Sequence, residues 1–535
     1  MADTDLRPAL QGRPARGDLL AGLSVTLVLL PQAVAYAVLA GLPPRSGLVV
    51  AGVSTIIAAP FVSSPLLQTG PTAITSLLTL GTLASVSATT GADVVGLAAL
   101  LALLVGLVRV VIGWRGAGEV AYLVSEPVLL AFTSAAGLVI MLSQLPKLLG
   151  SDVSGDGVAV TALLALGDTD GWVITSLVLG AIAISIVYVL AEVNPLLPGV
   201  LIAAAGGIVA AIVLDLDVAL VGDVPNALPM LDLGLPWSTV PQLAVPALVI
   251  GLVGFSEASA IARSFATESG QRWSANREFV SQGVANIAAG LVGGMPVGAS
   301  FSRSAINRRA GAKSAWSGVV TGVLVLVALP FAGIIEQLPK SVLAGIIVAA
   351  VLGLVDPRPW LELRNYSRQQ FGIALITYVL TILFAPQIQW AVLIGVLLVI
   401  GAHLRRERKL EIDADVTKTT LRLHPVGLLH FGAVQRLEDQ VRDLLADHPE
   451  VDRLVVHLGR VGRTDVTGAL VLRRLLREAA SRGIEVRLED ITTTSRKIIG
   501  RVLDGDDQLP NVLPEEVEEV PSPWGRTPFG TGPRA

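Results

Sequence analysis

The run LLAGLSVTLVLLPQAVAYAVLAGL at residues 19–42 contains no charged side chain. A transmembrane helix needs about 20 consecutive apolar residues, so this run is long enough to cross a bilayer. Arg7, Arg13 and Arg16 precede it, an arrangement that resembles a secretory signal peptide. The run is too long for such a peptide and lacks a small-residue cleavage pattern, so we interpret it as a retained first membrane helix.

Similar apolar segments recur along most of the chain. Hydrophobic residues make up 52% and charged residues 15% of the 535-residue sequence, against about 25% charged residues in soluble domains. The sequence therefore predicts a polytopic α-helical membrane protein with fourteen transmembrane segments, some of them too short to cross a bilayer alone. The candidates lie at about 18–40, 46–62, 70–88, 92–113, 124–145, 171–191, 196–214, 241–264, 278–294, 299–310, 314–335, 341–355, 370–385 and 387–404.

The basic residues set the predicted orientation. With the N-terminus in the cytoplasm, only Arg45, Lys147 and Lys340 fall in short outer loops, whereas the other loop cations, including the cluster at 405–409, face the inside. This distribution agrees with the positive-inside rule. An even number of spans returns the C-terminus to the cytoplasm, and the acidic loop at 214–242 then lies outside.

After Lys409 the sequence mixes apolar and charged residues, which is typical of a soluble domain. Strand-like and helix-like segments alternate, a pattern that predicts a small layered α/β domain of about 95 residues. The apolar strand at 453–458 indicates burial on both faces of a sheet. The predicted strands are 421–423, 427–431, 453–458 and 485–488, the helices are 434–447, 466–482 and 493–502, and a loop covers 462–465.

The C-terminal tail is rich in Pro, Gly and Glu and is predicted to be disordered. The predicted organisation is thus a cytoplasmic N-terminal segment (1–17), a transmembrane domain (18–409), a soluble α/β domain (410–508) and the tail (509–535).

The composition and the motifs do not indicate an enzyme. The chain has no cysteine and five histidines, and it contains no P-loop or metal-ligand spacing. We predict no enzyme activity, no cofactor, no bound metal and no nucleic-acid partner. The absence of an ATP-hydrolysing motif also speaks against a process driven by ATP hydrolysis.

Two predicted membrane segments, the third and the tenth, are short and open with Gly and Pro. The third begins QTGPTAITS at residues 68–76, and the tenth begins GGMPVGASFSRS at residues 293–304. Pro71 fits the first turn of the third helix. If the fourteen segments form two sevens of opposite topology, these two helices correspond, and both begin near the membrane midplane and face each other.

Two facing helix N-termini favour an anion, because they present unpaired N–H groups and the positive ends of two dipoles. The hydroxyls of Thr72, Thr75, Ser300 and Ser302 add neutral donors. The alternative is that Gly, Pro and Ser only allow close helix packing, as they commonly do in membranes. Two such segments at related positions favour the binding site.

Two ionisable residues lie inside predicted segments. Arg303, three residues into the tenth helix, adds a positive charge behind the dipoles; the alternative is that it extends to the cytoplasmic interface beside Arg308 and Arg309. Glu257 is the only acidic residue deep inside a predicted segment of the second half. It is a candidate for taking up a proton or sodium ion that moves with the anion, and the alternatives are a structural pair with Arg303 or a solvated position in a cavity.

The first segment adds two polar candidates. Gln32 follows the helix-kinking Pro31, and Tyr36 lies one turn further on the same face. The two side chains are candidates for one wall of the pocket, although Gln and Tyr also join helices without binding any ligand.

Several long motifs occur in the order found in one known family. They are AGLSVTLVLLPQAVAYAVLAGLPPRSGL (21–48), QTGPTAITSLL (68–78), SEASAIARSFA (256–266) and NREFVSQGVANIAAGLVGGMPVGASFSRSAINRRAGAKS (276–314), followed by a STAS-like C-terminal domain. From Asp18 to about Asp504 the chain resembles the sulfate permease (SulP) family of anion transporters.

The resemblance implies two inverted repeats of seven segments that form a core and a gate domain, a cytoplasmic STAS domain and usually a homodimer. It places the anion between the third and tenth helices, with a glutamine and an aromatic residue from the first. Those roles map to Gln32, Tyr36, Thr72, Ser302 and Arg303.

Two details of the resemblance bear on substrate and coupling. Thr72 stands where animal relatives have an aromatic residue, which leaves a more polar pocket and weakens any transfer of chloride preference. Glu257 fits the proton-coupled bacterial members, whereas a sodium-coupled bicarbonate relative would need additional hydroxyl ligands.

The soluble domain carries one regulatory candidate. STAS domains often read Asp, any residue, Ser or Thr, Gly before a helix, here Asp465 to Gly468, which makes Thr467 a candidate phosphorylation site. In transporters this element is more often structural.

The leading prediction is secondary active transport of sulfate across a bacterial inner (plasma) membrane, coupled to protons and driven by an elevator-like shift of the core domain. Bicarbonate and dicarboxylates are alternative substrates. The other hypotheses are a nucleobase–proton symporter of the same general fold, against which the STAS-like domain and the SFSRSA segment speak, and a membrane-tethered STAS regulator without transport.

Overall fold

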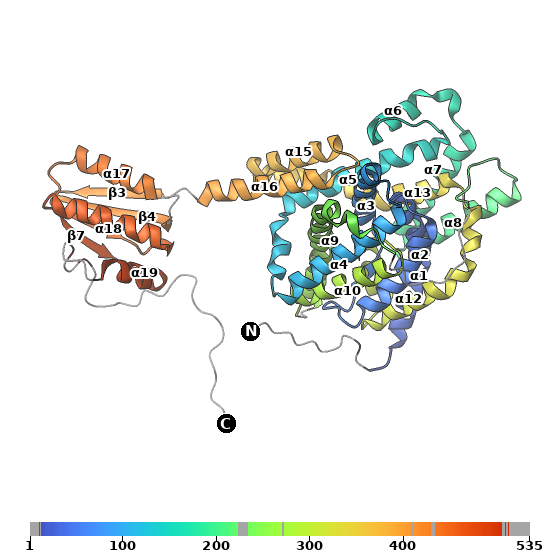
Figure 1. Cartoon of the computed structure of the whole chain (residues 1–535), viewed down its shortest axis with the longest axis horizontal. Helices are drawn as coiled ribbons and strands as arrows, with labels where there is room; N and C mark the ends of the chain where they lie inside the picture. The colour runs from blue at the N-terminus through green and yellow to red at the C-terminus, as the bar shows by residue number, and fades with distance from the viewer. Residues whose placement is uncertain are drawn as a thin grey trace. The chain divides into compact units, whose positions relative to one another are not determined.

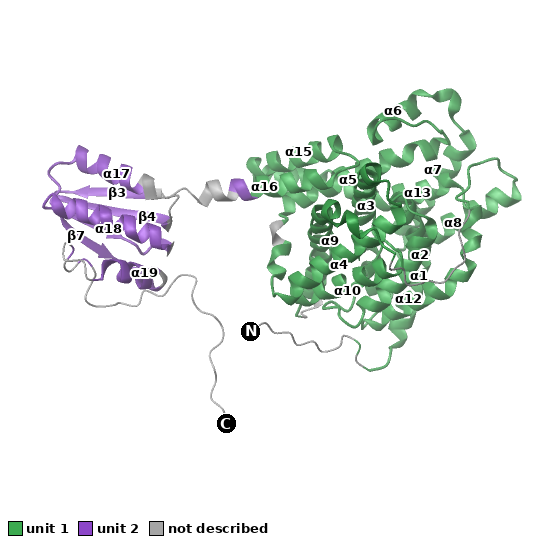
Figure 2. Cartoon of the chain, viewed as in Figure 1, with its two compact units in different colours: residues 1–399 green, residues 400–535 purple. Residues whose placement is uncertain are grey.

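The computed structural model describes residues 10, 12–222, 234–269, 272–407, 411–429, 434–504, 509 and 512. The chain divides into two compact units, residues 1–399 and 400–535 (Figure 2). The finer domain boundaries proposed from the sequence stay predictions. The first nine residues, Arg408, Lys409 and the predicted disordered tail beyond Val512 lie outside the described residues.

The first unit is helical, because its apolar segments satisfy their backbone hydrogen bonds within helices, as lipid requires. Each of the fourteen predicted segments contains one helix. Among the described residues, eight helices are long and apolar enough to cross a membrane, and several others are shorter, so the number of spans stays a prediction. The helices that match predicted segments are α1 (Arg16–Leu39), α2 (Pro44–Ala58), α3 (Ala73–Thr90), α4 (Val94–Trp114), α5 (Glu126–Leu149), α7 (Ile174–Val193), α8 (Gly199–Val213), α9 (Val240–Ser269), α10 (Ala275–Leu291), α11 (Phe301–Arg309), α12 (Trp316–Ala328), α13 (Lys340–Val351), α15 (Arg368–Leu383) and α16 (Gln389–Glu407).

Two further helices, α6 (Val158–Gly167) and α14 (Arg358–Tyr366), were not predicted. α6 is apolar but too short for a span, and α14 mixes arginines with exposed Leu361 and Tyr366 and has no buried residue. A search for long apolar runs passes over both kinds of helix.

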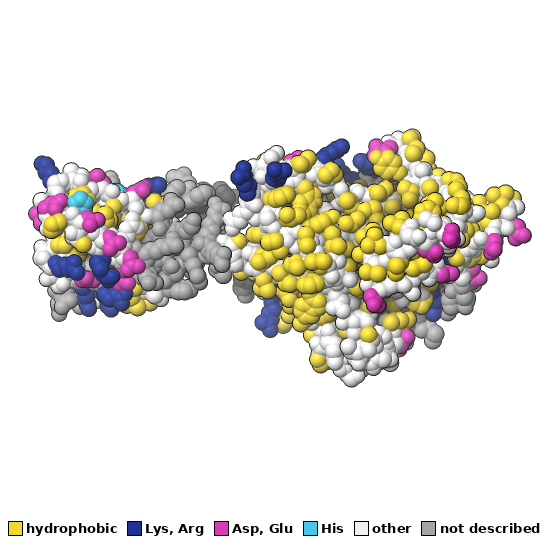
Figure 3. Space-filling model, turned by 90° about the horizontal axis from the view of Figure 1, so that it is seen from above, with side chains coloured by type: hydrophobic (Ala, Val, Ile, Leu, Met, Phe, Trp, Pro, Cys, Tyr) yellow, Lys and Arg dark blue, Asp and Glu magenta, His cyan; other side chains and the backbone are white. Residues whose placement is uncertain are grey.

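The outer surface of the first unit is apolar. Figure 3 shows hydrophobic side chains over much of its visible face, whereas charged side chains of both signs are spread over the visible face of the second unit. Many large apolar side chains of the first unit are more than half exposed, among them Leu163, Ile174, Val213 and Leu383. Exposed apolar surface of this extent is typical of a face in contact with lipid.

Close packing of α4 and α10 forms the support behind the candidate site (Figure 1). A Cβ atom on Gly106 of α4 would lie 2.6 Å from the backbone nitrogen of Ile287 and 2.7 Å from the carbonyl oxygen of Gly283 in α10. Only glycine allows the two backbones to approach so closely, as is common between membrane helices.

The second unit is a five-stranded sheet with three helices, the predicted small α/β domain. The strand order is β3-β4-β5-β7 with β6 beside β4; β3 and β4 are antiparallel, and the other pairs are parallel. The elements are β3 (Glu411–Thr417), β4 (Thr420–Leu429), α17 (Val434–Asp447), β5 (Arg453–His457), β6 (Val461–Thr464), α18 (Val466–Ser481), β7 (Glu485–Glu489) and α19 (Thr493–Leu503).

Four details of this unit correct the sequence prediction. The two short strands predicted at 421–423 and 427–431 are one strand, β4, whose register shifts at Gly427. The loop predicted at 462–465 is mostly strand β6, and β3 was not predicted. These strands are short or polar, and their pairing with β4 is what fixes them. Leu509 and Val512 pack into the core of this unit, although the prediction places residue 509 at the start of the tail.

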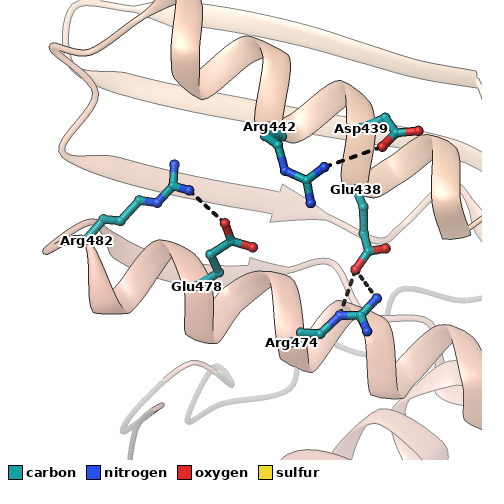
Figure 4. A network of polar contacts seen from close by, with 6 residues as sticks. All are labelled: Glu438, Asp439, Arg442, Arg474, Glu478 and Arg482. Carbon is teal, nitrogen blue, oxygen red and sulfur yellow. Dashed lines mark hydrogen bonds and ion pairs between the residues drawn. The ribbon is translucent and has the colours of Figure 1, made fainter.

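α17 and α18 lie side by side and are joined by surface charges (Figure 4). Arg474 of α18 pairs with Glu438 of α17, and pairs within each helix flank this contact: Arg482 with Glu478 at 2.7 Å and Arg442 with Asp439 at 3.6 Å. Exposed pairs of this kind contribute about 0.2–1 kcal/mol each, so the buried core carries most of the stability.

Candidate functional site

The two interrupted helices start from a small antiparallel sheet. β1 (Thr69–Gly70) pairs with β2 (Gly298–Ala299), with Thr69 opposite Ala299 and Gly70 opposite Gly298, and the backbone N–H of Ser300 donates to Gln68 O at 3.1 Å. α3 follows β1 and α11 follows β2. This pairing brings the starts of the two helices close together, and because the strands are antiparallel, the helices leave from opposite ends of the sheet. Their position at the membrane midplane stays a prediction.

Hydroxyl groups cap both helices. Thr72, in extended conformation, is the N-cap of α3, and its Oγ1 accepts from Thr75 N at 3.3 Å and lies 2.9 Å from Thr75 Oγ1. Ser300 is the N-cap of α11; its Oγ lies 3.5 Å from Arg303 N and 3.3 Å from Ser302 Oγ. Pro71 precedes the N-cap, so its predicted place in the first helical turn is wrong.

The caps leave the first N–H groups of both helices free. Within the described part of the chain, no protein group accepts a hydrogen bond from the backbone N–H of Ala73 and Ile74 in α3 or of Phe301 and Ser302 in α11. Free N–H groups at a helix start carry the positive end of the dipole and bind anions. Four such N–H donors therefore lie beside one two-stranded sheet.

Arg303 lies fully buried next to this sheet. Its Nη1 donates to Pro71 O at 2.9 Å, while Nε and Nη2 have no hydrogen-bond partner among the described residues. A Cβ atom on Gly70 would lie 3.4 Å from Nη2, so the guanidinium contacts β1 directly. The alternative in which Arg303 extends to the membrane interface is wrong, because the side chain is 0% exposed. By contrast, Arg308 on the same helix is exposed and pairs with Glu268.

Glu257 and Tyr36 are close enough to Arg303 for electrostatic interaction. Glu257 on α9 is half-buried, and the described residues include no carboxylate within ion-pair distance of Arg303, so the two residues do not form the direct structural pair that was one alternative. Tyr36 on α1 is buried. Gln32, one turn earlier, is also buried, and its Oε1 has no partner among the described residues.

The other predicted residues differ in exposure. Ser302 is exposed on the first turn of α11, whereas Thr72, Thr75 and Ser300 are buried. The structure thus gathers residues from α3, α9 and α11 around the β1–β2 sheet, and α1 packs against α3 and α11. Thr467 belongs to the second unit, where it is exposed in the first turn of α18.

Comparison with known proteins identifies the chain at the level of family. The model of the sulfate permease family matches residues 16–377, and that of the STAS domain matches residues 411–502. The chain belongs to the sulfate permease family. This permease is 34% identical over 376 residues to a probable sulfate transporter of Mycobacterium tuberculosis, a match that covers 69% of the chain and 66% of the relative. It is 29% identical over 513 residues to a chloroplastic sulfate transporter of Arabidopsis thaliana, covering 88% and 75% of the two chains.

Solved structures show the same fold. The permease resembles murine solute carrier 26 family member A9, an anion transporter, with a TM-score of 0.84 at 18% identity over 92% of this chain and 88% of the other. It also resembles the transmembrane domain of a cyanobacterium bicarbonate transporter, with a TM-score of 0.64 at 22% identity over 74% and 100% of the two chains. The permease is therefore a multi-pass membrane protein of an anion transporter family with a C-terminal STAS domain, and its named relatives are transporters rather than enzymes.

Sequence reasoning missed the polar residues that support the two segments. Glu278 is fully buried at the start of α10 and accepts from the backbone N–H groups of Ser63 and Ser64 at 2.9 and 3.2 Å, so an acid at the first position of the predicted segment 278–294 is buried more deeply than Glu257. Gln282 donates to Thr69 Oγ1 at 2.7 Å. Asn286 and Arg109 were missed as well. Their signal was available, because a polar side chain inside an apolar helix needs a partner.

Proposed function

We propose that this permease is a secondary active transporter that carries sulfate together with protons across a bacterial inner membrane. The observation that carries the proposal is the convergence of four free helix N–H groups and the two unpaired donor nitrogens of Arg303 beside the β1–β2 sheet. These donors suit an anion with several acceptor oxygens, since sulfate presents acceptors in four directions. The names of the two similar sulfate transporters support the choice of sulfate.

The substrate-binding residues in this proposal are Gln32, Tyr36, Thr72, Ser300, Ser302 and Arg303. The two dipole ends supply about half an elementary charge each, and Arg303 supplies a full charge. Together they offset most of the charge of a divalent oxyanion when the nearby Glu257 carboxylate is protonated. Since Thr72 and Ser300 already cap their helices, they position the N–H groups and bind through the remaining hydroxyl capacity.

Glu257 is the proposed proton carrier. When it is ionised, its half-buried carboxylate offsets part of the positive charge of Arg303, so a divalent anion then meets uncompensated negative charge. Uptake of a proton by Glu257 removes one of those charges, which favours loading of the anion and proton together. An elevator-like movement of the helices around the β1–β2 sheet then carries both across the bilayer, with the STAS domain in the cytoplasm and a homodimer as the working unit. Thr467 stays a regulatory candidate outside this cycle.

The test is uptake of labelled sulfate into proteoliposomes, with and without an inward proton gradient, and with excess bicarbonate, fumarate or chloride as competitor. The proposal is supported if a proton gradient stimulates uptake and unlabelled sulfate is the strongest competitor. If bicarbonate or fumarate competes more strongly, that anion is the substrate instead of sulfate. Absence of any anion flux would favour the membrane-tethered regulator.

The coupling role is tested by Glu257→Gln, with Glu268→Gln as the matched control on the exposed part of the same helix. The Glu257 variant should lose the stimulation of uptake by the proton gradient and keep detectable sulfate binding, while the control behaves as wild type. Unchanged proton dependence in E257Q would exclude Glu257 as the proton carrier.

A further inference from the structure

Arg109 is a fully buried arginine in the C-terminal third of α4. Its three donor nitrogens each bind a backbone carbonyl: Nε donates to Gly251 O at 3.0 Å, Nη1 to Val297 O at 2.9 Å and Nη2 to Ile250 O at 3.3 Å. Among the described residues, no carboxylate lies within ion-pair distance of this guanidinium. The side chain thus connects α4 to α9 and to the residue directly before β2.

A buried cation without a carboxylate is costly, because neutral carbonyl groups replace its water only in part. A neutral polar side chain at residue 109 would join the same helices at a smaller cost. The cost and the choice of carbonyl partners point to a role for this guanidinium beyond helix packing.

The Val297 peptide is held from two helices at once. Asn286 of α10 donates from Nδ2 to Val297 O at 3.0 Å, and its Oδ1 accepts from Val297 N at 2.9 Å. Val297 O therefore receives one bond from Arg109 and one from Asn286, while its own N–H is also occupied. β2 begins at the next residue, and α11 begins three residues after β2 starts. The direction in which the free N–H groups of α11 point depends on this peptide.

The same guanidinium contacts α9 close to Glu257. A Cβ atom on Gly254 would lie 2.7 Å from Arg109 Nη2 and 3.3 Å from Thr75 Cγ2, so Arg109 occupies the space beside the first turn of α3 as well. Gly254 precedes Glu257 by three residues, less than one helical turn. One cation therefore fixes the position of the carboxylate-bearing turn of α9 relative to the start of α11.

We propose that Arg109, together with Asn286, is a positioning residue for anion binding: it holds the Val297 peptide so that the α11 N-terminus points at the anion. The arrangement matches that of Arg303, whose Nη1 donates to Pro71 O before the N-cap of α3. In each interrupted helix, one buried arginine therefore binds a backbone carbonyl of the segment that precedes the N-cap. This inference rests on the proposed anion site. In this proposal Arg109 does not contact the anion.

The experiment uses the full-length protein and the variants Arg109→Gln, Arg109→Lys, Asn286→Ala and Arg115→Gln. Arg115 lies exposed at the end of the same helix and serves as the matched control. Two quantities are measured: the sulfate Kd of purified protein, with KM and maximal rate in proteoliposomes, and the amide hydrogen exchange of residues 295–304 without anion.

We expect R109Q and N286A to raise Kd and KM by about 10- to 100-fold, because a misplacement of about 1 Å costs that much at a site built on geometry. The maximal rate should change less. R109K should restore part of the affinity, because it keeps the charge but reaches fewer carbonyls. Exchange of residues 295–304 should become at least about tenfold faster in R109Q and N286A, as expected when a local contact is lost. R115Q should match wild type.

The proposal would be overturned if a folded R109Q or N286A keeps Kd and KM within about twofold of wild type and shows unchanged amide exchange of residues 295–304. If R109Q does not fold, the neutral N286A variant decides by the same criteria. If the wild-type protein binds no anion, the proposed function fails by that result alone, and exchange of residues 295–304 then decides whether Arg109 fixes the α11 start.

Discussion

Replacing Arg303 by methionine should change anion affinity and protein stability in opposite directions. Met fills a similar space without a charge. The substitution removes the two unpaired donor nitrogens, Nε and Nη2, that are available to an anion, and it also removes the bond from Nη1 to Pro71 O. A hydrogen bond to a charged group contributes about 1.5–3 kcal/mol, so we expect the loss of both donors to cost R303M about 3–6 kcal/mol of sulfate binding. Since 1.4 kcal/mol is tenfold in Kd, this loss corresponds to about 150- to 20,000-fold weaker binding.

The anion-free protein should not lose stability. Arg303 is 0% exposed, and two of its three donor nitrogens have no partner among the described residues, so the empty site holds a poorly satisfied cation. Replacement of buried ionic groups by apolar side chains is often neutral or stabilising by about 1–4 kcal/mol. Loss of the bond to Pro71 O offsets part of this gain. The melting temperature of R303M without anion should therefore equal or exceed that of wild type.

The assay compares sulfate Kd and anion-free melting temperature for wild type, R303M and Arg308→Met. Arg308 lies on the same helix, is exposed and pairs with Glu268, so R308M controls for loss of one positive charge from α11. R308M should bind sulfate as wild type does. A variant R303M that melts well below wild type and still binds sulfate with unchanged Kd would refute the assignment, because Arg303 would then be a structural residue.

Three further predictions test the surroundings of the site. Gly106→Leu should abolish folded protein or lower the melting temperature strongly, because its side chain would meet the backbone of Gly283 in α10, and overpacking alone costs about 1–3 kcal/mol; normal melting would contradict this packing. Deletion of residues 410–535 should lower expression or uptake and leave sulfate Kd unchanged, and a well-folded truncated protein without sulfate binding would disprove the division of roles. Thr467→Glu should slow amide exchange in α18, because a negative charge at a helix start contributes about 0.3–1 kcal/mol, and faster exchange would oppose this.

The helices were predictable because the signal for each is local. Long apolar runs and Gly–Pro interruptions are visible within about 20 residues of sequence. The approach of the two interrupted helices was predictable in outline, since both interruptions carry the same kinds of residues and occur at corresponding positions, whereas the pairing of β1 with β2 was not predicted. Thr72 and Ser300 were singled out from the sequence as anion-binding candidates, and their role as N-caps is plain only in the structure.

The supporting contacts were not predictable, because their partners are distant in sequence and many of them are backbone atoms. Arg109 binds carbonyls 141 to 188 residues away, and Gln282 binds Thr69 across 213 residues. Backbone carbonyls have no sequence signature, so a single chain shows only that a buried polar residue needs some partner. The same reason explains β6, a four-residue strand that is fixed by its pairing with β4.

The start of α11 depends on tertiary contacts for physical reasons. α11 has nine residues, fewer than the about 12–15 that an isolated helix needs to be stable in water. Its N–H groups therefore cannot hold their direction through helix propensity alone. Gln68 fixes the backbone of Ser300, Asn286 and Arg109 fix that of Val297, and Arg303 returns to Pro71 before α3. Any movement that carries the anion across the membrane must keep these contacts together, so we expect the β1–β2 sheet, α4, α9 and α10 to move as one body.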